Sequence, residues 1–317
     1  MERKNSSKNR NILNVVAGAL LLCAIVIVPT LSFAKSNEIY VDNDSKGKED
    51  GSKNHPYTNI EKAIQKADSG DKIFVSSGTY KVNITLPKDV DLIGKGKNKV
   101  TLKGDDKDDP VVIMSDKSKI DNVEIEGGKH GIVVKEGARA KIYNVRIKDS
   151  RREGIIILKG RSNDDERVEL IDSSVKESGR SGIYAQNRKL VFINNNIHDN
   201  NGNGVVLEDD MKAYLEKNTI RNNDKTGVVV DLDESEVTFR NNDIIKNGRE
   251  GVEINAKGAN GYISFHKDTI TGNGMYGIAL LERRNFPRSL WNSVQMRDTN
   301  TVLNNKSGNI SQPIRTY

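Results

Sequence analysis

The sequence predicts an all-β chain that folds as a single-stranded right-handed parallel β-helix, a three-sheet solenoid with coils of about 22–24 residues and an N-terminal capping helix. Three observations predict it. A glycine-led apolar pattern recurs at nearly constant spacing, asparagines recur at a fixed place in it, and no segment of ten or more residues between the glycines has helical periodicity.

The repeat has an isoleucine, an asparagine three residues later, and a glycine four residues after that, followed by alternating apolar residues. Its clearest copies carry Gly204, Gly227, Gly251 and Gly277. From Gly131 to Gly277 the repeat glycines lie 23, 28, 22, 23, 24 and 26 residues apart. A unit of this length accommodates three short strands, and only stacking on neighbouring units buries its apolar edge.

A second polar column lies two residues before the apolar position of each repeat. Stacked asparagines hydrogen bond along the axis and tolerate the left-handed backbone of a sharp bend. The right hand follows from the chirality of parallel crossovers. The column consists of Ser173, Asn195, Asn218, Asn242 and Asp268.

The segment 57–67 is expected to form a helix that covers the open end of the solenoid. Ile60, Ala63, Ile64 and Ala67 share one helical face. Thr58 and Glu61 are expected to form a capping box at its start.

This helix and the next strand resemble a known family. Residues 60–80, a helix followed by Gly-Asp-x-Ile-x-Val-x-x-Gly-Thr-Tyr, resemble the N-terminal cap of the pectate-lyase-like right-handed parallel β-helix superfamily, which includes carbohydrate-binding/sugar-hydrolase repeat proteins. The resemblance covers about residues 38–310. It implies polysaccharide binding or processing, with a ligand cleft along the outward face of the glycine-led strands.

The chain begins with features of an export signal. Basic residues precede an apolar run over 12–28, and Ser32-Phe33-Ala34 is suited to signal peptidase. Residues 1–34 are thus expected to be a signal peptide or an N-terminal membrane anchor. The protein would be secreted, periplasmic or on the cell surface, and would touch a membrane only through this segment if it is not cleaved.

The expected organisation after residue 34 is a cap over 38–80 and a β-helix over 81–310, with an insertion at 284–292 and a tail at 311–317. Cys23 is the only cysteine, so disulfides do not stabilise the mature chain. That part carries 46 basic and 43 acidic side chains, a balance that argues against nucleic acid as a partner.

The outward positions of the glycine-led strands and the turns after them form an acidic patch. Neighbouring carboxylates one coil apart repel unless a proton or a cation lies between them, and Ca²⁺ prefers such ligands. A solvated acidic turn explains the same pattern without a metal. The candidate Ca²⁺ ligands are Glu208, Asp210, Asp231, Asp233 and Glu253.

Two resemblances to catalytic sites of the superfamily are incomplete. In its lyases an Arg or Lys removes a proton beside bound Ca²⁺, which implies Arg188 or Lys257 as the base. In its polygalacturonases Asp-Asp and His-Gly precede successive strands, as Asp108, Asp109 and His130 do here, but the family's earlier Asn-Thr-Asp is missing. The sequence contains no complete catalytic constellation.

Several functions remain open. The favoured one is an exported β-helix protein that binds, or binds and processes, an acidic polysaccharide or cell-surface glycan. The alternatives are a non-catalytic surface or adhesion scaffold, a Ca²⁺-dependent polysaccharide lyase, and a partner in metal delivery or assembly. His198 and His266 have no metal-ligand spacing and are interpreted as surface residues of turns and strands.

Overall fold

The computed structural model describes residues 36–95, 99–160, 166–256, 260–283, 293–311 and 314–316. These belong to one compact unit, residues 35–317. The export segment 1–34 and the insertion 284–292 lie outside the described residues, so both stay predictions. Within the described ranges, no helix has the length and apolar character needed to span a bilayer.

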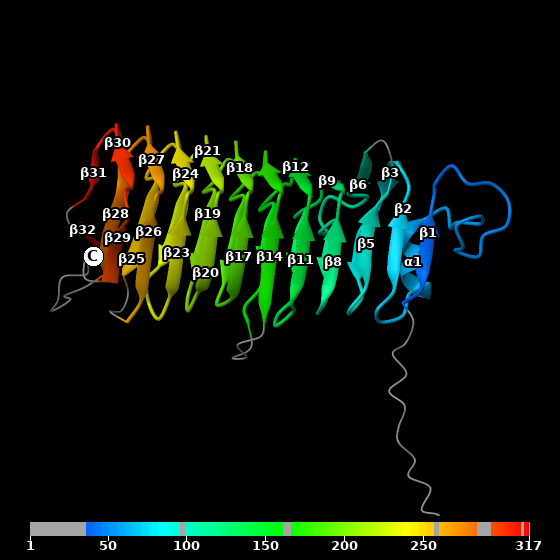
Figure 1. Cartoon of the computed structure of the whole chain (residues 1–317). Helices are drawn as coiled ribbons and strands as arrows, with labels where there is room; N and C mark the ends of the chain where they lie inside the picture. Colours follow the sequence, from blue (N-terminus) through cyan, green and yellow to red (C-terminus); the bar gives the residue numbers. More distant parts are fainter. Residues whose placement is uncertain are drawn as a thin grey trace, which may run out of the picture. The chain divides into compact units, whose positions relative to one another are not determined.

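Three parallel sheets run along the unit, and from β2 onward each coil contributes a strand to each of them (Figure 1). The first sheet consists of β1 (Glu38–Val41), β2 (Lys72–Val75), β5 (Asp91–Gly94), β8 (Ser118–Asp121), β11 (Ala140–Tyr143), β14 (Arg167–Ile171), β17 (Lys189–Ile193), β20 (Lys212–Glu216), β23 (Glu236–Arg240), β26 (Tyr262–His266) and β29 (Val294–Arg297). The second sheet consists of β3 (Gly78–Lys81), β6 (Val100–Lys103), β9 (Glu124–Glu126), β12 (Arg146–Lys148), β15 (Ser174–Lys176), β18 (Asn196–His198), β21 (Thr219–Arg221), β24 (Asp243–Ile245), β27 (Thr269–Thr271) and β30 (Thr301–Leu303). The third sheet consists of β4 (Ile84–Leu86), β7 (Val112–Met114), β10 (Ile132–Val134), β13 (Ile155–Ile157), β16 (Ile183–Gln186), β19 (Val205–Glu208), β22 (Val228–Asp231), β25 (Val252–Ala256), β28 (Tyr276–Arg283) and β31 (Gly308–Ile310), and β32 (Ile314–Thr316) also pairs with β28.

The core is a set of columns in which like residues stack on like. Ile220 of β21 pairs with Ile197 and Ile244 in the flanking coils, and all three are buried. In the first sheet the rings of Phe239 and Phe265 stack with centroids 4.8 Å apart. These columns confirm the predicted strands and their inward faces.

The glycine column exists because coils approach closely there. A Cβ on Gly204 would lie 2.6 Å from the carbonyl oxygen of Gly227 and 2.6 Å from a methyl group of Ile220. The glycine therefore provides space for the neighbouring coil, and its place in the repeat follows from packing.

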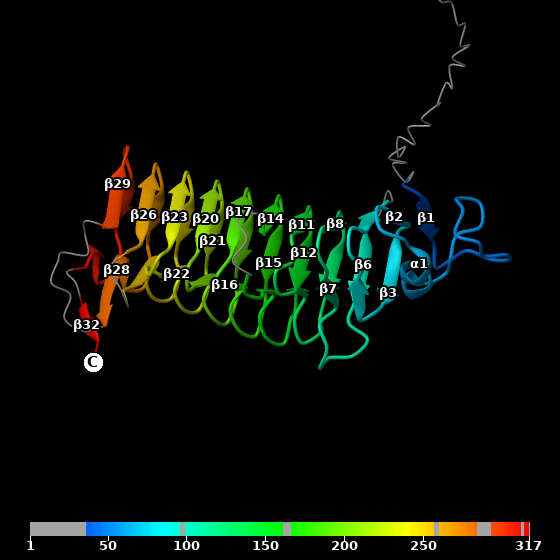
Figure 2. The ribbon, with the colours of Figure 1, turned by 90° about the horizontal axis from the view of Figure 1, so that it is seen from below.

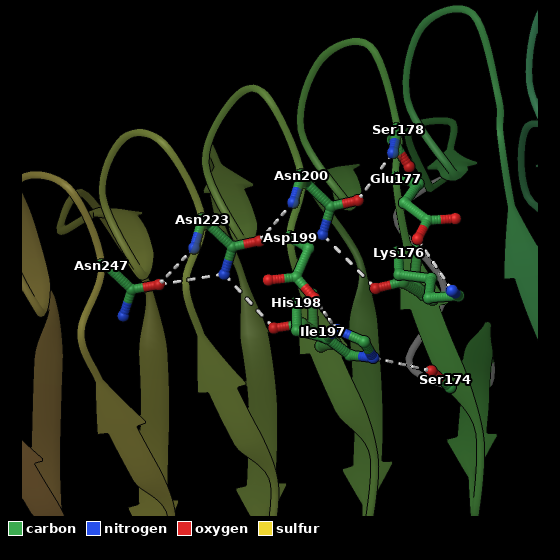
Figure 3. A network of polar contacts seen from close by, with 11 residues as sticks. Ser174, Lys176, Glu177, Ser178, Ile197, His198, Asp199, Asn200, Asn223 and Asn247 are labelled. Carbon is green, nitrogen blue, oxygen red and sulfur yellow. Dashed lines mark hydrogen bonds and ion pairs between the residues drawn. The ribbon is translucent and has the colours of Figure 1, made fainter.

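Both polar columns of the repeat form buried ladders. In the predicted column, Asn195 donates from Nδ2 to Oδ1 of Asn218, and Asn218 donates likewise to Asn242, both at 2.9 Å. The repeat asparagines form the second ladder, in which Asn200 Nδ2 donates to Asn223 Oδ1 at 2.8 Å (Figure 3). Each amide thus links a coil to the next.

The helix α1 (Ile60–Lys66) packs at the β1 end of the solenoid (Figure 2). Ile60 and Ala63 are fully buried, as the helical face predicted. The predicted capping box is wrong, because the N-cap is Asn59, whose side chain accepts from the backbone N–H of Lys62 at 2.8 Å. The hydroxyl of Thr58 instead donates to Glu49 at 2.7 Å.

Candidate functional site

A groove of about 440 Å³ lies on the outward face of the first sheet, across β5, β8, β11, β14 and β17. Its charged side chains stand in two columns, because alternate strand residues face outward. One column starts the strands and the other lies two residues further along. The charged lining residues are Asp89, Asp91, Lys117, Lys119, Arg139, Lys141, Arg167, Glu169 and Lys189, six cations and three carboxylates. We call this the basic groove.

The register of the strands sets the order of charges in the inner column. Asp91 pairs with Lys119, Lys119 with Lys141, and Lys141 with Glu169. Consecutive coils therefore place these side chains about 4.8 Å apart along the axis. Burial raises the pKa of the Asp91 carboxyl, while Lys119 opposes that rise.

Some of the groove's cations are matched by carboxylates. The guanidinium of Arg139 binds both carboxylate oxygens of Asp116 at 2.9 Å and lowers the pKa of Asp116 to about 2. Arg167 Nε lies 3.0 Å from Glu169 Oε1. The hydroxyl of Tyr143 also donates to Glu169, and burial together with this bond raises the Tyr143 pKa.

Other cations remain available to a ligand. In the described part of the chain, neither Lys117 nor Lys141 makes an ion pair, and both are exposed. Lys119 pairs with Asp121 at 2.8 Å and lies 5.2 Å from the centre of the Tyr143 ring. The groove can thus bind anions through lysines and accept hydroxyl hydrogen bonds at its carboxylates.

The predicted acidic patch lies on the third sheet, away from the basic groove. Its carboxylates already bond to neighbours. The Tyr184 hydroxyl donates to Glu208 at 2.6 Å, and the Gln186 amide donates to Asp209 at 2.7 Å. Asp231 is only 4% exposed.

Glu253 is the outward carboxylate of β25 and lies close to Glu250. The hydroxyl of Thr226 lies 3.1 Å from Glu250 Oε2 and 3.5 Å from Glu253 Oε2. Burial, and then the nearby charge of Glu250, raise the pKa of Glu253.

These residues do not provide a converging set of metal ligands. Over the residues for which positions are described, no three His, Cys, Asp or Glu side chains are placed to hold a metal ion. Calcium binding by Glu208, Asp210, Asp231, Asp233 and Glu253 therefore stays a prediction that rests on like charges one coil apart. A calcium-dependent rise in melting temperature that Asp231→Asn removes would establish it.

Arg188 is not level with Asp210, although each lies five residues after the start of the paired segment of its strand, at Ile183 and Val205. Ile183 pairs with Val205, 22 residues on, but Lys189 pairs with Lys212, 23 residues on. The turn between the third and first sheets is therefore one residue longer in the second of these coils. Arg188 consequently lies level with Met211, whose sulfur accepts its backbone N–H at 3.4 Å.

Arg188 is 3% exposed, and its guanidinium donates to the backbone carbonyls of Leu158 and Ala138 in the two preceding coils. Desolvation by burial lowers its pKa, while Glu166 opposes this. The side chain thus links three coils and is poorly placed to meet a solvent-borne glycan. The other candidate base, Lys257, lies outside the described residues.

The polygalacturonase-like candidates precede two adjacent strands of the third sheet and have separate partners. Asp108 and Asp109 come just before β7, and His130 comes just before β10. Asp108 pairs with Arg151, and the Asp109 carbonyl accepts from the backbone N–H of Lys129 at 2.9 Å. His130 is buried, with Nδ1 3.3 Å from Glu153. Desolvation lowers the pKa of His130. No described contact joins the histidine to either aspartate side chain.

Comparison with known proteins identifies the fold. The family described as "Right handed beta helix region" matches residues 130–307, more than half of the chain. The chain belongs to this family.

Solved structures of other β-helix proteins extend the match over most of the chain. Pectate lyase Pel9A aligns at 13% identity and a TM-score of 0.58, covering 89% of this chain and 80% of that one. XylC in complex with xylose aligns at 11% identity and a TM-score of 0.58, covering 82% of this chain and 70% of that one. An alginate lyase from Paenibacillus sp. str. FPU-7 aligns at 14% identity and a TM-score of 0.54, covering 79% of this chain and 96% of that one. These likenesses show the pectate-lyase-like fold alone. A search of curated protein sequences found no match.

The sequence did not point to the basic groove of this β-helix protein, because the superfamily resemblance directed attention to the glycine-led strands of the third sheet. The groove lies on the strands of the first sheet, where Asp91, Lys119, Lys141 and Glu169 occupy equivalent outward positions. Reading these strands with period two would have found the charged column, but the depth of the groove depends on the fold.

Proposed function

We propose that this protein binds an acidic polysaccharide along the basic groove of the first sheet. The observation that carries the proposal is the excess of six cations over three carboxylates in one elongated depression. The structures of pectate lyase Pel9A and of a Paenibacillus alginate lyase, whose names state action on polysaccharides, support this class of ligand.

The regular spacing of the groove suits a linear polymer. Each coil repeats the same outward positions about 4.8 Å further along the axis. A chain of uronate residues laid along the sheet therefore meets charged or polar side chains at every coil. Lys117 and Lys141 bind its carboxylates, while Asp91 and Glu169 accept hydroxyl hydrogen bonds.

Binding to polygalacturonate, alginate and uncharged dextran at two salt concentrations tests the proposal. We expect the two polyuronates to bind and dextran not to bind. We expect affinity to fall at higher salt, since the contacts are exposed ion pairs. The double variant Lys119→Glu/Lys141→Glu should lose at least about tenfold in affinity, which is about 1.4 kcal/mol.

The matched control is the double variant Lys225→Glu/Lys246→Glu, which changes two exposed lysines in turns remote from the groove. It changes the charge in the same direction and should leave affinity unchanged. An equal loss of polyuronate affinity in both variants would show that net charge, and not the groove, controls binding. That result would favour the scaffold function. Release of unsaturated oligosaccharides in the same samples would add lyase activity to binding.

We propose in addition that the chain is exported, with cleavage after Ala34. Fold neighbours named for polysaccharide action fit a location outside the cytoplasm. N-terminal sequencing of the exported protein is expected to begin at Lys35, whereas a membrane-retained form that keeps Met1 would establish an anchor.

A further inference from the structure

A serine, a histidine and an aspartate form a hydrogen-bonded series on the outward face of the second sheet (Figure 3). Ser174 Oγ lies 3.4 Å from His198 Nε2, and His198 Nδ1 lies 2.5 Å from Asp199 Oδ2. The imidazole is thus held between a hydroxyl and a carboxylate through different nitrogens.

The strand register builds this arrangement from residues 24 and 25 positions apart. Ser174 of β15 pairs with Asn196 of β18, so His198 lies one coil on and two residues along. The outward alternation places both side chains on the same face. Asp199 follows β18 with a φ of 56°, a left-handed turn that leaves its carboxylate beside the imidazole.

The charges of the series define the tautomer of the histidine. The hydrogen bond from His198 lowers the pKa of Asp199, which is therefore ionised at neutral pH. The carboxylate accepts a hydrogen bond from Nδ1–H, and this tautomer leaves the lone pair of Nε2 facing the serine hydroxyl. The His198 side chain is 12% exposed, so bulk water competes little for these bonds.

Ser174 opens onto a second groove, of about 540 Å³, between the first and second sheets. Arg146 and Asn196 flank it in the two neighbouring strands, and Arg221 lies in the same groove. In the part of the chain that the structure describes, Oδ1 of Asn196 is buried and has no hydrogen-bond partner. The guanidinium of Arg146 and the Nδ2 amide of Asn196 carry N–H donors on the two strands that pair with the strand of Ser174.

We propose that Ser174, His198 and Asp199 form a nucleophilic site that hydrolyses carboxylic esters, with acyl groups on glycan hydroxyls as its substrate class. Hydroxyl, imidazole and carboxylate are here arranged as in Ser-His-Asp hydrolases, which recur on unrelated folds and are recognised by geometry. The cationic and amide donors around Ser174 supply the stabilisation that a developing oxyanion needs.

The reaction proceeds by acyl transfer. Ser174 Oγ attacks the ester carbonyl carbon as its proton passes to His198 Nε2. The tetrahedral intermediate expels the sugar alkoxide, which takes that proton and leaves an acyl-serine. A water molecule then attacks the acyl carbon and gives a proton to Nε2. Serine leaves as the alcohol by taking that proton back, so that ester and water yield carboxylic acid and sugar hydroxyl.

The position of the site relates it to the basic groove. β12 and β15 follow β11 and β14 directly in the same coils, so the two grooves occupy neighbouring faces. A glycan in the basic groove would thus present its side substituents towards Ser174. The choice of glycan esters rests on the proposed binding function, whereas the hydrolytic chemistry does not.

Hydrolysis of p-nitrophenyl acetate by the chain from Lys35 onward, and labelling by a fluorophosphonate, test the chemistry. We expect label on Ser174 and a fall of about 10³-fold or more in kcat/KM for Ser174→Ala and His198→Gln. Asp199→Asn should lower kcat with little change in KM, because it only positions the imidazole. All three side chains face outward, so melting temperatures should stay near wild type.

His266→Gln is the matched control, because His266 Nδ1 lies 3.2 Å from Asp298 Oδ2 in a second surface His–Asp pair. It should retain full activity on the small ester. Absence of label on Ser174, or hydrolysis equal in wild type and Ser174→Ala, would overturn the proposal. Activity on the small ester without release of acetate from acetylated polyuronate would instead overturn the assignment of glycan esters alone.

Discussion

At the scale of single residues, buried amides hold successive coils together. Asn218 accepts at Oδ1 from the backbone N–H and the side chain of Asn195, and donates from Nδ2 to Phe192 O and Asn242 Oδ1. Its four bonds join three coils. The network is buried, and a missing member leaves its partners without water to replace it.

Asn218→Ala is expected to lower the free energy of unfolding by about 2 kcal/mol, since buried donors and acceptors lose their partner. Asn201→Ala, which changes an exposed side chain of a neighbouring turn, serves as the control. Urea denaturation of both variants measures the difference. Equal stability of the two variants would contradict a structural role for the ladder.

Asp268 occupies the same ladder as Asn218 but as a carboxylate. Its Oδ1 accepts from the backbone N–H and the side chain of Asn242, and its Oδ2 accepts from the His266 backbone N–H. All three bonds are shorter than 3.0 Å. Burial raises the pKa of Asp268 despite these bonds. The free energy of unfolding is therefore unaffected below the unfolded-state pKa of about 3.9. It falls as the pH rises from that value through the folded-state pKa, because the buried carboxyl must then ionise.

Asp268→Asn should therefore raise the melting temperature at pH 7, because the amide carries no charge for burial to disfavour, while its oxygen can still accept from Asn242. At pH 3 the gain should vanish, since the wild-type carboxyl is then protonated in both states. Thermal melts at the two pH values check this. A gain of the same size at pH 3 would assign the effect to hydrogen bonding alone.

At the scale of elements, the strands are short, and their stability depends on the columns they form. β21 contains three residues, of which Ile220 is fully buried between Ile197 and Ile244. A three-residue strand has little intrinsic stability, so packing against the neighbouring coils maintains it. The turns between strands then decide which residues of successive coils align.

Ile220→Ala should destabilise the protein by about 3 kcal/mol, because it removes buried methyl groups and leaves a cavity in the column. Ile245→Ala makes the same chemical change on the partly exposed face of β24 and should cost much less. Denaturant titration of the pair isolates burial from strand propensity. A larger loss for Ile245→Ala would contradict the register of the second sheet.

At the scale of the whole molecule, a stack of parallel coils has open edges that must be covered. At the N-terminal end α1 contacts β1 and β2 and buries Ile60 and Ala63. An uncovered end would present backbone groups and apolar residues to other chains. We therefore expect the helix to protect the solenoid from end-to-end association.

Ala63→Glu should displace α1 and promote association, because an unpaired charge cannot remain buried against the core. Gln65→Glu introduces the same charge on the exposed side of the same helix and should leave the protein unchanged. Light scattering coupled to size-exclusion chromatography measures the outcome. A monomeric, wild-type-like Ala63→Glu protein would show that the cap is dispensable.

The amino-acid sequence alone predicts the β-helix, the coil length and the buried columns. These features arise from local period and from like residues stacking on like, as with Ile220 and Asn218. It also located the capping helix, although Asn59 rather than Thr58 begins it, since both residue types can cap and only the path of the chain selects one.

The faces that carry the candidate sites become apparent only when the coils are stacked in three dimensions. A turn one residue longer after β19 moved Arg188 level with Met211, a shift that no repeat spacing reveals. The basic groove is formed by side chains from five strands that lie side by side only in the folded protein. Ser174 and His198 lie 24 residues apart in the chain, but Ser174 Oγ and His198 Nε2 are 3.4 Å apart in space. The reason is that one coil of the solenoid brings Asn196 beside Ser174, and His198 is the next outward residue of the same strand.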